Sequence, residues 1–153
     1  LREFEKCGEV INLWQKTIYN NNVLLEDLFL WKCQAFELLC SLYSGIYEKA
    51  KSFTGKNQAN PNLRNYLSAV SNIYGFCKTL DKKHFKDVKD VRDKLTHNNP
   101  IKTITETQKK NAFSLIDYFL IKTICVICEI DCIPTSLCLM VSSNDNICKQ
   151  NNK

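Results

Sequence analysis

Hydrophobic residues recur at intervals of three and four along most of the chain, which is the period of an amphipathic α-helix. These stripes predict a helix over residues 3–19, a long helix of about 30 residues over 23–53 and a third helix over 63–80. A shorter helix over 81–97 precedes a last long helix over 103–129. The sequence therefore predicts an all-α fold: an up-and-down bundle of four main helices, with a short extra helix before the last.

Turn-forming residues mark the ends of these stripes. The segment 54–62 (TGKNQANPN) has the composition of a loop. Pro100 restricts Asn99 to extended angles, so the short helix has to end at about His97. Two candidate capping boxes lie at the start of the last helix: Thr103 with Glu106, and Thr105 with Gln108.

Composition agrees with a helical protein of one domain. The chain has 153 residues, of which 44% are hydrophobic, enough for a single core. It has only four glycines and three prolines, whereas sandwiches and barrels use turn residues at every strand end. We expect the bundle to span residues 1–130, and residues 131–153 to form a C-terminal tail that is partly packed or disordered.

Three features bear on location. The longest stretch without a charged residue is 13 residues, short of the roughly 20 that a spanning helix needs, so no membrane partner is expected. The chain begins at Leu1 without a secretory signal pattern, which predicts a processed chain or an excised domain and leaves room for flanking domains. Its nine cysteines are odd in number and spread through apolar stretches, which favours a reduced, cytoplasmic protein.

One group of cysteines has spacing reminiscent of metal ligands: Cys125, Cys128, Cys132 and Cys138. A second CxxC pair is missing and both histidines lie far upstream. A helix interior also lacks the tight turns that usually hold a tetrahedral zinc site. Packing against the core is therefore the favoured role of these residues, and neither a metal nor a cofactor is predicted.

Basic residues are concentrated in one part of the chain, whose formal net charge is +5. Residues 78–94 hold seven cations and four anions. One interpretation is a solvated helix face with i,i+4 ion pairs, such as Lys86–Asp90 and Lys89–Asp93. The other is a surface for a polyanionic partner.

The chemistry-bearing candidate lies at the end of this segment, in the sequence Arg92-Asp93-Lys94-Leu95-Thr96-His97. Asp93 and His97 are four residues apart on one helix face, so the carboxylate is expected to orient the imidazole. An arginine suits the binding of a phosphate, and a histidine suits proton transfer. The alternative is an Arg–Asp pair that only stabilises the helix end, with an exposed histidine beside it.

A helical bundle with this R-x4-H pattern before its last helix resembles the HEPN superfamily (higher eukaryotes and prokaryotes nucleotide-binding domains). The resemblance covers about residues 3–130 in helix order, and its specific part is Arg92, Asp93 and His97. It implies a metal-independent endoribonuclease that acts as a homodimer, with the two motifs brought together across the two-fold axis.

By this resemblance each motif residue has an expected role. His97 would assist attack of the RNA 2′-hydroxyl on the adjacent phosphate, Arg92 would hold that phosphate, and Asp93 would orient the other two. The neighbouring residues expected to contact RNA are Lys86, Lys89, Lys94 and Asn98. The resemblance is compatible with a defence or toxin effector that has an antitoxin partner.

The sequence departs from the family pattern at Asn99. HEPN toxins paired with a nucleotidyltransferase antitoxin carry a tyrosine two residues after the motif histidine, so regulation at such a tyrosine is not expected here. Some HEPN domains lack activity. A non-catalytic module for dimerisation, or for nucleotide or partner binding within a larger protein, is therefore the alternative function.

Overall fold

In a computed structural model, the described part of the chain is helical and contains no strand. The structure describes residues 8–13, 15–16, 24–55, 58–76, 82–97 and 103–129. The expected tail over residues 131–153 lies outside this part. The all-α prediction is confirmed, while the up-and-down arrangement of four main helices stays a prediction. Within the described residues, no helix combines the length and apolar character needed to cross a membrane.

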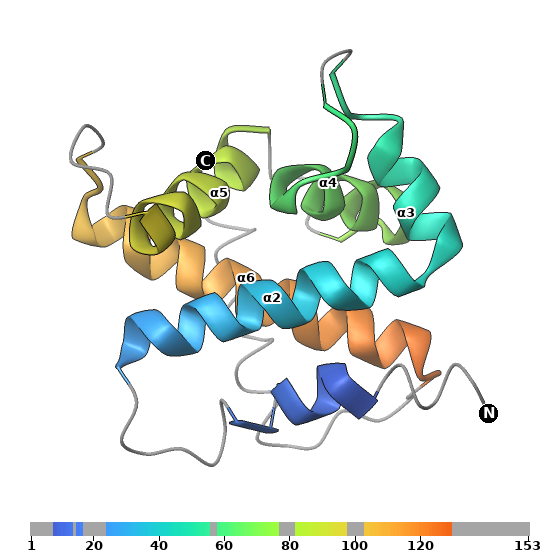
Figure 1. Cartoon of the computed structure of the whole chain (residues 1–153), viewed down its shortest axis with the longest axis horizontal. Coiled ribbons are helices and arrows are strands. Elements are labelled where there is room, and N and C mark those ends of the chain that lie inside the picture. Colours follow the sequence, from blue (N-terminus) through green and yellow to red (C-terminus); the bar gives the residue numbers. More distant parts are fainter. Residues whose placement is uncertain are drawn as a thin grey trace.

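The long helix expected over residues 23–53 is two helices in the structure. Helix α2 spans Leu25–Leu42 and α3 spans Ser44–Lys51. Tyr43 lies between them with extended angles (φ −98°, ψ 108°), so helical hydrogen bonding is interrupted there. The break redirects the chain and lets α3 pack against α4, where Ile46 and Ala50 are buried (Figure 1).

Helix α4 spans Leu63–Tyr74, shorter than the predicted third helix. It begins with a capping box in which the Asn62 side chain accepts from the Asn65 backbone N–H and the Asn65 side chain accepts from that of Asn62. Asn65 also donates to the carbonyl of Phe53 at 2.9 Å, which fastens the preceding loop. Gly75 ends the helix in the left-handed region (φ 68°), where a side chain would be strained.

The last two described helices agree closely with the sequence. Helix α5 spans Lys82–His97 and ends where Pro100 was expected to stop it. Helix α6 spans Glu106–Ile127. Of the two candidate capping boxes the structure forms that of Thr105 with Gln108, two residues later than the first possible start.

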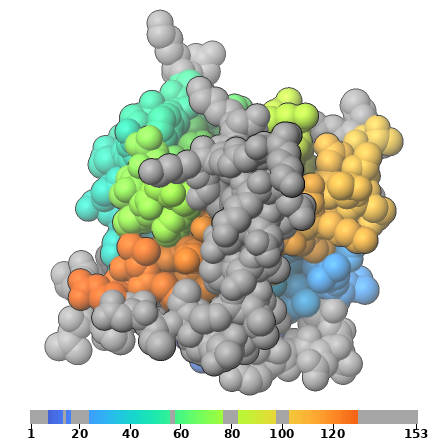
Figure 2. Space-filling model, turned by 180° about the vertical axis from the view of Figure 1, so that it is seen from behind, coloured from blue at the N-terminus to red at the C-terminus, as the bar shows by residue number. Residues whose placement is uncertain are grey.

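Helices α2 and α6 run side by side in the same direction (Figure 1). In the view from behind, the start of α6 lies directly above the start of α2 at one edge of the molecule (Figure 2). The residue numbers of their contacts increase in the same direction along both helices. Phe29 stacks on Phe113, Lys32 pairs with Asp117, and the ring of Phe36 contacts that of Phe119. In Figure 1, α4 and α5 lie on one side of this pair. Their apolar faces close the core and leave the end of α5 at the surface.

Candidate functional site

Helix α5 carries the candidate site, and its sequence explains its orientation. Phe85, Val88 and Val91 recur at intervals of three and are each at most 4% exposed, because they face α6 and the core. The charged residues occupy the remaining positions of the helix. Arg92 follows the last of the buried residues, and His97 is the last residue of the helix.

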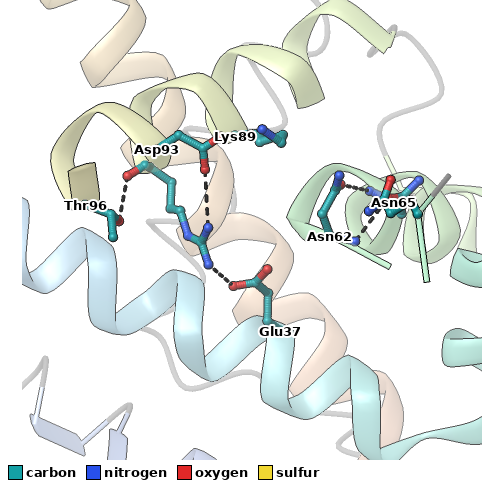
Figure 3. Close-up of polar contacts among 8 residues, drawn as sticks. Glu37, Asn62, Asn65, Lys89, Asp93 and Thr96 are labelled. Carbon is teal, nitrogen blue, oxygen red and sulfur yellow. Dashed lines mark hydrogen bonds and ion pairs between the residues drawn. The ribbon is translucent and has the colours of Figure 1, made fainter. Parts of the chain in front are cut away.

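The guanidinium of Arg92 links α5 to α2. Its Nη2 donates to Glu37 Oε2 at 3.0 Å and its Nη1 donates to Asp93 Oδ1 at 3.2 Å. Figure 3 shows Glu37 projecting from α2 towards α5, on the side where Asp93 lies. Burial works against the charged guanidinium, but attraction to Glu37 and Asp93 outweighs it and raises the pKa of Arg92.

Glu37 sits where three helices meet. Burial raises the pKa of its carboxyl group, while the charge of Arg92 and a backbone interaction with Leu63, the first residue of α4, act in the opposite direction. Its side chain is 22% exposed. A carboxylate with this little contact with water needs its cationic partner, so the Glu37–Arg92 pair fastens α5 to α2 beside the start of α4.

Asp93 is held from both sides by cations. Lys89, four residues earlier, hydrogen-bonds to its Oδ2, as the i,i+4 pattern predicted, and Arg92 hydrogen-bonds to its Oδ1. Burial alone would raise the pKa of Asp93, but these two cations outweigh burial and lower it. The contacts of Asp93 within the described residues are therefore with Lys89 and Arg92, whereas the sequence predicted an orienting contact with His97.

His97 is exposed at the C-terminal end of α5. Among the described residues, no hydrogen bond or ion pair involves its imidazole. Five residues along an α-helix correspond to about 140° of rotation, so Arg92 and His97 leave the helix in different directions. Within one chain the structure places Arg92 against α2 and His97 at the surface, and it does not bring the two groups together.

The residues expected to contact RNA differ in their availability. Lys86 is exposed on the outer face of α5. Lys89 is engaged with Asp93, and Lys94 is half-buried. Asn98 lies outside the described residues. Of this predicted set, Lys86 is the one whose surroundings best suit contact with a polyanion.

The role of Glu37 and the Lys32–Asp117 pair were not predicted from the sequence. Lys32 Nζ lies 2.6 Å from Asp117 Oδ1, joining α2 to α6. A signal for both was present in the sequence: Lys32 and Glu37 are the only charged residues between positions 28 and 47. Isolated charges in a helix that is apolar on two faces need partners on neighbouring helices. The sequence did not identify those partners, because they are 55 and 85 residues away.

The cysteines of the described chain do not form a metal site. Cys33 and Cys40 are fully buried, and burial raises the pKa of both thiols. Cys125 is partly buried against the core, whereas Cys128 is exposed, so packing accounts for the first of these two and not for the second. Among the described residues no group of three or more His, Cys, Asp or Glu side chains could hold a metal ion. Cys132 and Cys138 lie outside them.

Comparison with known proteins assigns no family to this site. No protein-family model, curated protein or solved structure matches the chain.

Asp117 makes the stability of the fold depend on pH. Burial raises the pKa of its carboxyl group above the ordinary value of 3.8, and Lys32 offsets only part of this effect. The folded chain therefore binds this proton more tightly than the unfolded chain does, and the stabilisation is lost as pH rises through the folded pKa. We expect the unfolding free energy of the wild type, relative to Asp117→Asn, to fall in urea titrations as pH rises from the ordinary value of 3.8 through the higher folded pKa.

Asp93 provides the opposite case for the same measurement. Because its pKa is lowered, its stabilisation is present above the ordinary value of 3.8 and is lost as pH falls through the folded pKa. The unfolding free energy of the wild type relative to Asp93→Asn should therefore fall towards acid. If the difference in unfolding free energy between wild type and variant changed with pH in the same direction for Asp117→Asn and Asp93→Asn, the opposite pKa shifts of the two carboxyl groups would be contradicted.

Proposed function

We propose that this chain is a metal-independent endoribonuclease of HEPN type that cleaves single-stranded RNA as a homodimer. The observation that carries the proposal is the combination found on α5: a guanidinium held by two carboxylates, and an exposed imidazole at the end of the same helix. The first suits the binding of a phosphate and the second suits proton transfer. The exposed Lys86 adds positive charge for the RNA backbone.

The reaction needs both groups at one phosphodiester. His97 removes the proton of the 2′-hydroxyl, whose oxygen attacks the adjacent phosphorus while the bond to the 5′-oxygen breaks and that oxygen takes a proton from water. The products are a 2′,3′-cyclic phosphate and a 5′-hydroxyl end. Arg92 stabilises the additional negative charge on the phosphate as the bond forms.

The direction of the two side chains accounts for the proposed dimer. Arg92 is directed to α2 and His97 is at the exposed end of α5, so one chain presents them apart. A two-fold axis near the end of α5 would place the motif of a second chain opposite the first. The proposal therefore joins catalysis to dimerisation, and a defence or toxin effector is the biological role that it fits.

A second candidate function rests on the charge balance around Arg92. Within this network the cations Lys89 and Arg92 are matched by the anions Glu37 and Asp93. A neutral network of this kind is also what a purely structural tie between helices would contain. A non-catalytic module for dimerisation or partner binding within a larger protein is the function that this observation favours.

Purified protein and labelled single-stranded RNA in excess EDTA separate the two functions. The ribonuclease proposal expects cleavage to 2′,3′-cyclic phosphate ends, no cleavage of an all-2′-deoxy strand, and a dimer by light scattering. Inert protein at micromolar concentration, over a range of RNA sequences, would favour the non-catalytic module. Cleavage that requires a divalent cation would contradict the metal-independent mechanism, although the protein would still be a nuclease.

A further inference from the structure

Glu37 is the one charged group outside α5 that contacts the Arg92 guanidinium within the described residues. It comes from the middle of α2, near the first residue of α4, so its own position is determined by two helices. Arg92 has a long side chain with many rotamers, and its neighbour Asp93 contacts the guanidinium only from within α5. The contact at 3.0 Å is what joins the guanidinium to a neighbouring helix.

We propose that Glu37 is a positioning residue for Arg92. It holds the Arg92 guanidinium in the place where the phosphate of bound RNA will contact it, before the RNA binds. This inference rests on the proposed ribonuclease function. Glu37 touches neither RNA nor the reacting atoms in this scheme. It acts through Arg92, and it lies far from the R-x4-H motif in sequence.

The hydrogen bonds leave Arg92 able to bind a phosphate while it is held. A guanidinium has five N–H groups, and the described contacts to Glu37 and Asp93 use one on each terminal nitrogen. Three N–H groups are left for another acceptor. The side chain of Arg92 is 31% exposed, so these groups are not all enclosed by protein. A prearranged donor of this kind stabilises a transition state better than a mobile one does.

Glu37 could act in the opposite way if its negative charge competed with the RNA phosphate for Arg92. The two effects predict opposite results for Glu37→Gln, which removes the charge and keeps a hydrogen-bond acceptor of the same size. If Glu37 positions Arg92, the variant loses activity. If Glu37 competes with RNA, the variant gains activity.

The chain supplies a matched control in Asp117. Its side chain is 26% exposed, close to the 22% of Glu37, and it also pairs with a cation on a neighbouring helix. Burial raises the pKa of both carboxyl groups. Asp117→Asn therefore removes a comparable interhelical ion pair that has no contact with Arg92 among the described residues. It measures how much activity is lost through weakened helix packing alone.

The test compares kcat and KM for RNA cleavage by the wild type, Glu37→Gln, Glu37→Asp and Asp117→Asn. We expect Glu37→Gln to lower kcat on the order of tenfold, as a misplaced catalytic group does, with KM changed less than about threefold. Glu37→Asp keeps the charge and should recover part of kcat. Asp117→Asn should keep kcat near the wild-type value. A kcat for Glu37→Gln equal to that of Asp117→Asn, or above wild type, would overturn the positioning role.

An activity-independent measurement distinguishes failure of this inference from failure of the proposed function. The chain has three arginines, so the guanidinium signals of Arg92 can be assigned by NMR with Arg92→Lys. Slow rotation of this guanidinium in the wild type and faster rotation in Glu37→Gln are expected. If the Arg92 guanidinium rotates slowly in a protein that does not cleave RNA, the proposed ribonuclease function is refuted, whereas the contact between Glu37 and Arg92 is confirmed. A freely rotating guanidinium in the wild type would refute the positioning role whatever the activity.

Discussion

Replacing His97 by Ala is expected to lower the rate of RNA cleavage by about 10²–10⁴-fold, the usual contribution of a general acid or base. The loss should fall on the chemical step, because the imidazole moves the proton of the attacking hydroxyl. Stability should change little, since His97 is exposed at the end of α5. Cleavage is measured with labelled single-stranded RNA in EDTA, and folding is checked by urea unfolding of the same preparation.

His84 supplies a matched control for this prediction. It is the only other histidine of the chain, and it lies in the first turn of the same helix. His84→Ala should leave the cleavage rate within about threefold of the wild type, because α5 places this residue at its opposite end. Equal rates for wild type, His97→Ala and Arg92→Ala would exclude the proposed mechanism, whatever nuclease remained in the preparation.

Phe119→Ala is expected to lower the unfolding free energy by about 3–5 kcal/mol, the largest effect on stability that we predict. Phe119 is fully buried on α6. Four other rings surround it with centroids 5.6–6.2 Å away, from α2, α5, α6 and the turn that follows α4: Phe36, Phe76, Phe85 and Tyr118. Because the neighbours belong to different helices, the cavity left by the ring cannot close by moving one side chain.

This prediction is tested by urea unfolding against a substitution on the same helix. Val126 lies near the end of α6 and is 40% exposed, so Val126→Ala should cost less than about 0.5 kcal/mol. A total stability of roughly 5–15 kcal/mol is usual for a domain of this kind, so Phe119→Ala could also be isolated partly unfolded. A loss below about 1 kcal/mol would show that the five rings do not form a cooperative core.

Several helix ends followed from local sequence alone. The end of α5 at His97 was predicted from the restriction that a proline places on the residue before it, and Thr105 begins α6 through hydrogen bonds to a residue three positions away. These signals act over one helical turn, so the neighbouring residues are sufficient to predict them. The end of α4 was predicted wrongly: the sequence extended this helix to residue 80, whereas Gly75 ends it in the left-handed region.

The break at Tyr43 did not follow from local sequence. The hydrophobic stripe continues through this residue, and the nearest weak helix former is Gly45. The chain turns there because Ile46 and Ala50 are buried on the face that packs against α4. Packing against a distant segment outweighs a local helical preference that amounts to only a fraction of 1 kcal/mol per residue.

The candidate site likewise has features that the sequence could predict and features that only the structure reveals. The location of the motif residues on one helix and the Lys89–Asp93 pair could be predicted, because both depend on fixed spacing along that helix. The partner of Arg92 could not, because Glu37 precedes it by 55 residues and meets it only when α2 and α5 pack together.

By itself the sequence determined the helical class of this protein, most helix ends and the placement of an arginine and a histidine at the end of one helix. These properties depend on backbone angles and on contacts within a few residues. Only the tertiary structure decided that Arg92 turns to Glu37 while His97 stays exposed, and that one long stripe becomes two helices. Those choices depend on which apolar faces bury each other, and on which buried charges then find a partner of opposite sign.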